Sequence, residues 1–186
     1  MKTFTIEDIR SWRPYDDLAD YFPEDWSGTA LDILDVEDCP PWDRLWAVLR
    51  AGELDVNTLS RIACRCVRET PLGDGRTVWD LLTDERSRRG VEAREAFLRG
   101  EIGDEEMAVA VIAAHDARTA AWIPPEVAGV PTKAPTMAAA CAASNTAGAC
   151  SMAASAAVGF FDAARTVQLQ IAREEIEKGA EDENAS

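Results

Sequence analysis

The sequence predicts an all-α protein, a helical bundle around a long alanine-rich central helix, with an irregular acidic N-terminal segment. The first observation is the stretch Ala134–Phe161, whose 28 residues carry no charge in a chain where 28% of residues are charged. Alanine has the highest helix propensity of all residues, and its small side chain lets other helices approach closely. The second observation is that no segment alternates apolar and polar residues as a half-buried strand does. We therefore expect this stretch to form a helix buried among its neighbours.

A transmembrane helix is the first alternative for this stretch, since about 20 apolar residues suffice to cross a bilayer. Alanine, however, inserts far less readily than Leu, Ile or Val. Polar residues also interrupt the stretch, namely Ser144, Asn145, Thr146, Ser151 and Ser155. The flank that follows it is acidic rather than basic. A buried bundle helix is therefore favoured, and no membrane partner is expected.

In the first part of the chain, local signals predict short helices with clear boundaries. Thr5 and Asp8 have the spacing of a capping box, and Pro14 ends the helix that they begin. Residues 27–34 favour another short helical turn. A longer helix begins near Pro41, because proline is tolerated in a first turn. Its apolar residues recur at positions i, i+3, i+4 and i+7, namely Trp42, Leu45, Trp46 and Leu49.

The next predicted helix begins after Asp55, a residue type that caps helix N-termini, and ends before Pro71. Its outer side carries Arg61, Arg65 and Arg68 at spacings of four and three residues. We expect this ridge to be a solvated helix face paired with nearby acidic residues. Further helix starts are expected at Thr77, Asp84 and Asp104.

The second half of the chain contains longer helices and one linker. A helix is expected from Glu105 to about Trp122, with acidic residues at its positive N-terminal end. Residues 123–135 contain four prolines and form the predicted linker. After Phe161 the pattern is amphipathic, with Asp162, Arg165, Arg173 and Glu174 expected to face solvent.

A length of 186 residues suits one domain. We expect a single helical domain over residues 1–178, which includes the irregular acidic and aromatic segment 1–36 and the proline-rich linker 123–135. Residues 179–186 are expected to be a disordered acidic tail. The first residues lack the apolar stretch of a signal peptide, so a cytoplasmic location is expected.

The net charge of −15 is unevenly distributed. Residues 1–55 hold 14 acidic and 5 basic residues, whereas residues 56–99 hold 7 acidic and 9 basic residues. Direct binding to nucleic acid is disfavoured, because contacts with phosphates need a basic surface. An acidic surface instead suits a basic protein partner and accelerates its association. Solubility alone explains the charge equally well.

Five cysteines and one histidine offer little material for a catalytic or metal site. Cys64 and Cys66 point to nearly opposite sides of a helix, which favours free thiols over a disulfide or a zinc site. His115 and Asp116 are adjacent on a helix and so do not face each other. No nucleophile elbow or His-Glu-x-x-His motif occurs. We therefore expect no catalytic, cofactor-binding or metal-binding residue, no cofactor and no enzymatic activity.

The best candidate for a binding surface is the segment between Pro14 and Ser27, where acidic residues alternate with aromatic ones. Interfaces favour Tyr and Trp at their centre and charged residues at their rim. Covering the edge of the core is the commoner role for such a segment. The predicted partner-binding residues are Asp16, Asp17, Asp20, Tyr21, Glu24, Asp25 and Trp26.

Three stretches resemble a bacterial family of alanine-rich helical immunity proteins. They read DCPPWDRLWAVLR (38–50), TLSRIACRCVRE (58–69) and FLRGEIGDEEMAVAVIAAHDARTAAW (97–122). Members of this family share a helix with a Cys-x-Cys pattern, an acidic hinge after Gly-Glu-Ile and long alanine-rich helices. The resemblance spans residues 38–165 and leaves the first 36 residues unmatched. It implies a non-catalytic protein that binds and neutralises a toxin domain, and it transfers no functional residue.

The expected function is therefore that of an acidic inhibitor or immunity-type protein that occludes a basic effector, such as a toxin or a nuclease. One alternative is a phage anti-CRISPR or DNA-mimic protein, which would block a nucleic-acid-binding site by the same physics. The other is a structural module in which the alanine-rich helix packs against that of a second copy. The sequence leaves the oligomeric state open.

Overall fold

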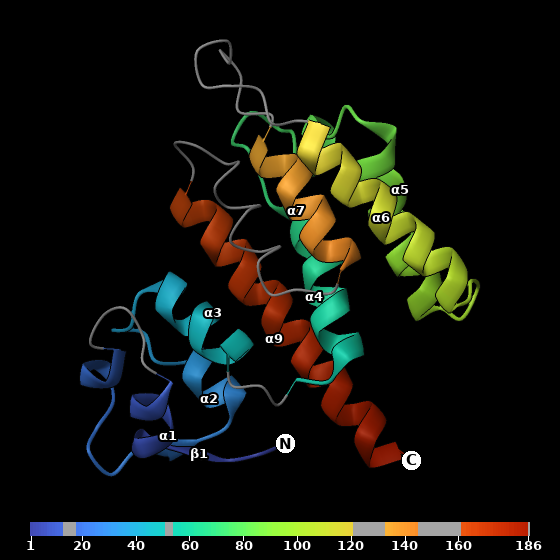
Figure 1. Ribbon diagram of the computed structural model, residues 1–186. Helices are drawn as coiled ribbons and strands as arrows, with labels where there is room; N and C mark the ends of the chain where they lie inside the picture. The colour runs from blue at the N-terminus through green and yellow to red at the C-terminus, as the bar shows by residue number, and fades with distance from the viewer. Residues whose placement is uncertain (13–17, 51–53, 121–132, 145–160, 186) are drawn as a thin grey trace.

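The computed structural model describes residues 1–12, 18–50, 54–120, 133–144 and 161–185 and confirms an all-α bundle (Figure 1). The N-terminal third contains short elements, which are β1 (Phe4–Thr5), α1 (Ile6–Ser11), the 3-10 helix η1 (Leu18–Tyr21), β2 (Ser27–Gly28), α2 (Ala30–Leu34) and α3 (Pro41–Arg50). The longer helices follow, which are α4 (Val56–Glu69), the 3-10 helix η2 (Val78–Leu81), α5 (Glu85–Leu98), α6 (Asp104–Ala120), α7 (Lys133–Ala143) and α9 (Phe161–Ala185).

Two groups of helices pack on opposite sides of an α4–α9 pair. Helix α9 packs against α2 and α3 of the N-terminal third and against α4. Helix α4 in turn packs against α5 and α7, and α5, α6 and α7 contact one another. In Figure 1 the N-terminal elements and the α5–α6 hairpin therefore lie at opposite ends of the molecule, with α9 running diagonally between them.

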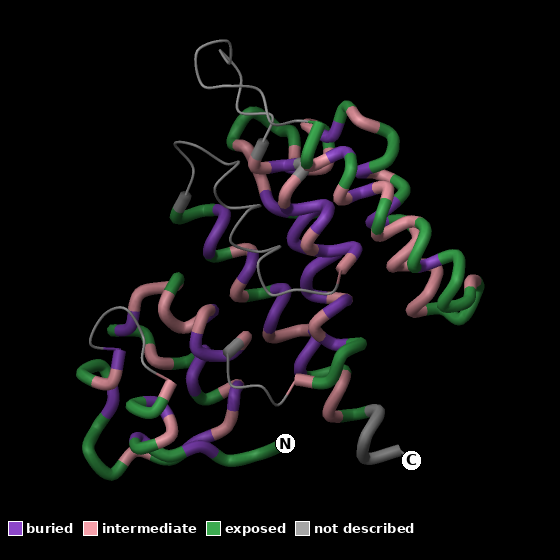
Figure 2. Tube along the Cα trace, in the orientation of Figure 1, coloured by how far each residue is buried: buried purple, intermediate pink, exposed green. Residues whose placement is uncertain are grey.

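The core is continuous from β1 and α1, through α2–α4 and α9, to α7 (Figure 2). The described part of the alanine-rich stretch is buried as predicted. Five of its alanines are fully inaccessible, namely Ala138, Ala139, Ala140, Ala142 and Ala143, and Ala134 is partly buried against the core. Residues 145–160 of the stretch lie outside the described residues. Helix α7 packs against α4, α5, α6 and η2, and α4 packs against α5, α7, α9 and η2, so these two helices share the centre of the bundle.

The predicted helix caps are present. The backbone N–H of Thr5 donates to Asp8 at 2.8 Å, and Asp55 accepts from the backbone N–H of Asn57 at 2.8 Å. A box of the same kind, Thr29 with Asp32, begins α2. These contacts satisfy N–H groups that have no partner inside their helices, so local sequence is enough to place the boundaries.

The N-terminal segment 1–36 is more regular than expected. Strands β1 and β2 pair antiparallel, with Phe4 opposite Gly28 and Thr5 opposite Ser27. Each strand has only two residues, which is too short for alternation to be visible in the sequence. This ladder closes the N-terminal chain into a loop and fixes the position of residues 18–26 against α1.

Two helix boundaries also differ from the expectation. Helix α7 begins at Lys133, inside the predicted linker 123–135, because Pro135 falls in the first turn where its missing N–H costs nothing. Helix α9 continues to Ala185, through the residues predicted to form a disordered tail from 179 onward.

Arg165 was expected to face solvent, and the structure shows this to be wrong, because its exposed fraction is only 3%. Its guanidinium lies over the ring of Trp42 on α3, 4.2 Å from the ring centroid, and donates to Gln168 Oε1 at 2.9 Å. Gln168 in turn donates to Thr70 Oγ1 at 3.0 Å. A polar strip of α9 is thus buried because other helices supply its partners.

None of the helices in the described ranges combines the length and the apolar character needed to span a bilayer.

Candidate partner-binding surface

Residues 18–26 are held against the N-terminal elements by apolar contacts and by one backbone hydrogen bond. Leu18 and Phe22 are buried, and the ring of Phe22 packs edge-on against Trp26 with 4.8 Å between centroids. The backbone N–H of Ile6, at the start of α1, donates to the carbonyl of Trp26 at 3.2 Å. These anchors leave the remaining side chains of the segment to point outward.

The structure places four of the seven predicted residues on the surface. Asp20, Tyr21, Glu24 and Asp25 are exposed, and the exposed fraction of Tyr21 is 40%. Asp16 and Asp17 lie outside the described residues. The segment therefore presents acidic groups and one phenol side by side.

Trp26 has a mainly supporting position. It is half-buried, and its ring lies so close to β2 that a Cβ on Gly28 would be 2.8 Å from Trp26 Cζ2. Glycine at position 28 is therefore required for this packing, because a side chain there would collide with the ring. Trp26 covers the edge of the core and exposes only part of its surface.

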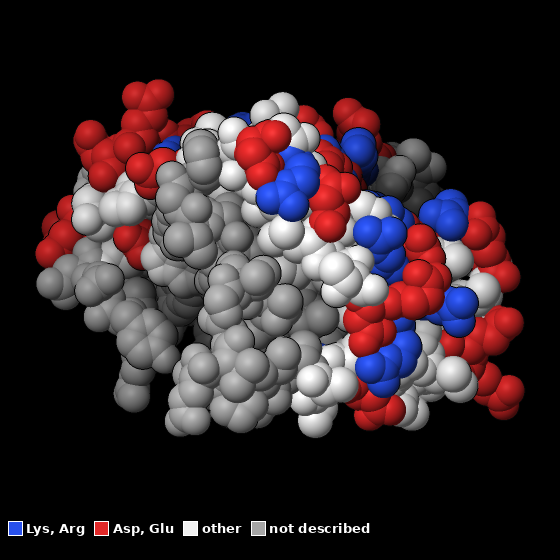
Figure 3. Space-filling model, turned by 90° about the horizontal axis from the view of Figure 1, so that it is seen from above, with Lys and Arg blue, Asp and Glu red and all other residues white. Residues whose placement is uncertain are grey.

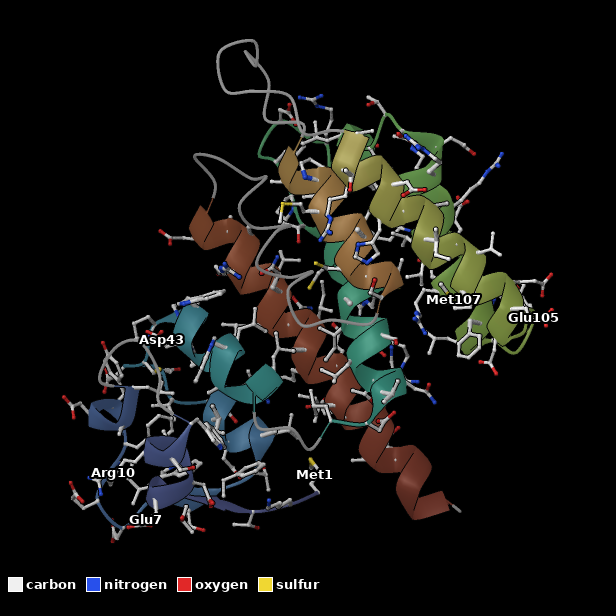
Figure 4. The ribbon with its side chains drawn as sticks, viewed as in Figure 1. Met1, Glu7, Arg10, Asp43, Glu105 and Met107 are labelled. Atoms are coloured by element: carbon white, nitrogen blue, oxygen red, sulfur yellow. The ribbon has the colours of Figure 1, made fainter. Side chains whose placement is uncertain are left out.

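A single arginine lies among these carboxylates. Arg10 Nη2 donates to Glu24 Oε1 at 2.6 Å, and Glu7 and Asp20 also lie within electrostatic reach of Arg10 (Figure 4). The hydrogen bond with Glu24 and the negative charges around it raise the pKa of Arg10. Within the described residues, Glu7, Asp20 and Asp25 form no ion pair. We call Glu7, Asp20, Glu24 and Asp25 the acidic face.

Glu7 is the member of the acidic face that sequence reasoning missed. It lies in the first turn of α1, where an acidic residue is explained by the helix dipole alone. Only the folding of residues 18–26 back onto α1 brings it near Arg10 and Asp20. No local sequence pattern predicts that Glu7 lies near Arg10 and Asp20.

The arginines of the basic segment 56–99 are already engaged, as predicted for the ridge on α4. Arg61 pairs with Glu175, Arg65 with Glu69, Glu174 and Glu175, and Arg68 with Glu95. On η2 and α5 and in the loops around them, Arg76, Arg86, Arg89 and Arg99 pair with acidic residues, and Arg88 and Arg94 donate to backbone carbonyls.

This pairing separates the charge of the molecule into two regions. In Figure 3, which views the molecule from above, acidic and basic side chains alternate over the right-hand part of the molecule, where α5 and α6 lie. All nine arginines of residues 56–99 thus have partners within the molecule. The acidic face keeps a surplus of negative charge that a cationic surface can meet.

The described residues offer little for nucleophilic or metal chemistry. Burial raises the pKa of the Cys39 and Cys64 thiols to about 12, so both remain protonated and unreactive at neutral pH. His115 Nε2 lies 2.7 Å from Ser144 Oγ and links α6 to the end of α7. No group of three or more His, Cys, Asp or Glu side chains within the described ranges is arranged to hold a metal ion.

A hollow of about 350 Å³ lies between α2, α3 and α9. Its two guanidinium groups already have partners, since Arg173 pairs with Asp35 and Arg44 Nη1 donates to the Leu34 carbonyl at 2.8 Å. These contacts tie α9 and α3 to the end of α2. We therefore assign the hollow a structural role.

Comparison with protein-family models, with curated proteins and with solved structures found no match to this chain. The resemblance to alanine-rich immunity proteins therefore stays a prediction. The functional argument depends on the geometry and the charge of the surface itself.

Proposed function

We propose that this chain is a non-catalytic, immunity-type inhibitor that binds a basic protein effector, such as a toxin or a nuclease, and occludes it. The observation that carries the proposal is the surplus of negative charge on the acidic face, whereas the arginines of the basic segment 56–99 already have partners elsewhere in the molecule. The face lies on a segment anchored by Leu18 and Phe22, so its carboxylates are presented in a fixed arrangement.

Such a face would act by competition. A nuclease or other nucleic-acid-binding effector presents lysines and arginines that normally meet phosphates, and a row of carboxylates can occupy the same groups. Long-range attraction increases the association rate and weakens as salt screens the charges. Exposed Tyr21, beside Asp20, supplies the aromatic contact that interfaces favour.

Self-association through the alanine-rich helix has less support. Five of the six alanines of α7 have no accessible surface and Ala134 is partly buried against the core, so an intramolecular core already accounts for them. A second copy cannot reach these side chains without opening the bundle.

The proposal is tested by co-expressing the tagged chain with basic toxin or nuclease domains as candidate effectors and measuring capture at low and high salt. Capture should fall at high salt and should be lost in the double variant Asp20→Asn/Asp25→Asn. The matched control is Glu37→Gln/Asp38→Asn, which removes the same charge from exposed positions between α2 and α3.

Equal capture by the Asp20→Asn/Asp25→Asn variant and the wild type would remove the acidic face from consideration. Loss of capture in both double variants would mean that total charge, rather than this face, is responsible. Competition by duplex DNA would show that the blocked surface of the effector is its nucleic-acid-binding site.

A further inference from the structure

Helix α6 carries an apolar stripe that nothing in the described structure covers. Val109 and Ile112 are among the most exposed large apolar side chains of the molecule, with exposed fractions of 68% and 62%. Ala108 lies beside them and is also exposed. The opposite side of α6 packs against α5 and α7 through the buried residues Met107, Ala114 and Ala117.

A carboxylate lies at each end of this apolar stripe along the helix. Glu105 and Asp116 are eleven residues apart, which is three helical turns, so both lie on the same face as Ile112. Both are exposed, and neither forms a hydrogen bond or an ion pair with a residue in the described part of the chain. We call Glu105, Ala108, Val109, Ile112 and Asp116 the α6 stripe.

The neighbouring arginines of α5 form their ion pairs with other carboxylates. Arg86 Nη2 pairs with Asp84 at 2.7 Å and lies within electrostatic reach of Asp116 without pairing with it, and Arg89 Nε pairs with Glu85 at 3.3 Å. The surface around the α6 stripe is therefore locally balanced, and the two terminal carboxylates remain available to an outside group.

We infer that the α6 stripe is a docking surface for an amphipathic helix of a partner protein whose apolar face is flanked by a lysine or arginine at each end. The two carboxylates are separated by about 16 Å, from a rise of 1.5 Å per residue. A partner helix with basic residues eleven positions apart spans the same distance. Its apolar residues then lie over Val109 and Ile112 in the way that amphipathic helices bind apolar faces.

The charges select this occupant over a second copy of the chain. If two α6 helices pair antiparallel about the midpoint of the stripe, between Ala110 and Val111, Glu105 of one copy comes near Asp116 of the other. If they pair parallel, each carboxylate meets its own counterpart. Like charges at an interface cost several kcal/mol, so both arrangements are disfavoured. The net charge of −15 adds to this repulsion and also disfavours an anionic lipid surface.

This surface goes beyond the proposed function and is separate from the acidic face. In Figure 4, Glu105 lies at the far end of the α5–α6 hairpin, whereas Glu7 and Arg10 lie on the N-terminal elements at the other side of the molecule. Variants of one surface leave the other intact, so the two proposals succeed or fail independently.

The test uses two synthetic helical peptides and the full chain. The first peptide has lysines eleven positions apart and leucines at the fourth and seventh positions after the first lysine, on an alanine and glutamine background. The second has glutamates in place of the lysines. By fluorescence anisotropy, the wild type should bind the lysine peptide at least tenfold more tightly than the glutamate peptide.

Three variants give the expected contrasts. Val109→Ser/Ile112→Ser should lose at least tenfold in affinity for the lysine peptide, and, because both positions are exposed, it should unfold at the temperature of the wild type. Val56→Ser, which changes a valine with an exposed fraction of 63% on α4, should bind like the wild type. Glu105→Lys/Asp116→Lys should reverse the preference and bind the glutamate peptide more tightly.

Three results would overturn the inference. The first is equal affinity of the wild type for both peptides, and the second is unchanged affinity in Val109→Ser/Ile112→Ser. The third is a concentration-dependent dimer in sedimentation that the same double variant abolishes, which would make a second copy the occupant of the stripe.

Discussion

At the scale of single residues, Glu175 is a buried carboxylate that holds helices α4 and α9 together through ion pairs. Its exposed fraction is 2%, and it meets Arg61, Arg65 and Lys178, each within 3.0 Å. Burial acts to raise its pKa, but the hydrogen bonds from Lys178 and Arg65 outweigh burial and hold the pKa below its ordinary value. The ionised form is therefore the stable one in the folded chain, and it joins α4 to α9.

Replacing this carboxylate should be costly. We expect Glu175→Gln to lower the free energy of unfolding at pH 7 by about 2 kcal/mol, because buried hydrogen bonds to charged groups are lost. Because the folded-state pKa is lowered, the difference from wild type should shrink as pH falls below about 4. Urea unfolding at several pH values measures both effects. The control is Glu174→Gln, which changes a half-buried carboxylate that also pairs with Arg65 and should have a much smaller effect.

Arg10 illustrates how one residue can moderate a surface. It is the cation paired with Glu24 inside the acidic face, so its removal raises the negative charge there. If the proposed function holds, Arg10→Gln should bind the basic effector about two- to fivefold more tightly, the range of an exposed ion pair. Isothermal titration at low salt would measure it. Weaker binding would mean that Arg10 itself contacts the effector.

At the scale of helices, Gly90 of α5 marks a point where three helices approach one another closely. A Cβ at this position would lie 2.7 Å from the Cβ of Ala114 on α6 and 3.2 Å from that of Ala143 on α7. Both atoms are attached directly to helix backbones and cannot rotate away. Gly90 is thus needed because three helices meet there, although glycine is a poor helix former.

Gly90→Ala should therefore destabilise the protein in spite of its better helix propensity. Overpacking costs about 1–3 kcal/mol, and the gain in propensity is about 1 kcal/mol. We expect a melting temperature lowered by several degrees, measured by circular dichroism. In the double variant Gly90→Ala/Ala114→Gly the space is restored, so its loss should be smaller than the sum of the two single losses. Additive losses would contradict this account.

Contacts between residues close in sequence could be predicted, whereas contacts between distant residues could not. Caps such as Asp55 and Asp84 depend on residues two or three positions away, and these predictions are confirmed. The position of Arg165 depends on Trp42, more than a hundred residues earlier, so helical periodicity alone placed it wrongly. The exposure of Asp20 and Asp25 could be predicted from their charge. The contact between Arg10 and Glu24 could not, because it requires the β1–β2 ladder.

At the scale of the whole molecule, carboxylates with lowered pKa values occur in every region. Backbone hydrogen bonds from Thr5 and Thr29 lower the pKa of Asp8 and Asp32, and hydrogen bonds from Arg86 and Arg99 lower the pKa of Asp84 and Glu101. Each of these groups contributes stability above the pKa of the unfolded chain, near 4. That contribution is lost as pH falls through the lower pKa of the folded chain.

The net charge of −15 acts in the opposite direction between pH 7 and pH 5, because partial protonation relieves repulsion between carboxylates. We therefore expect the midpoint of urea unfolding to stay constant or rise slightly from pH 7 to pH 5, and then to fall steeply below about pH 4. Added salt should flatten the first part of the profile, since it screens exposed charges. Salt should change the steep part less, because the caps and the Glu175 cluster are short-range contacts. A midpoint that stays constant from pH 5 to pH 3 would show that paired carboxylates contribute little, and the bundle would then depend on apolar packing alone.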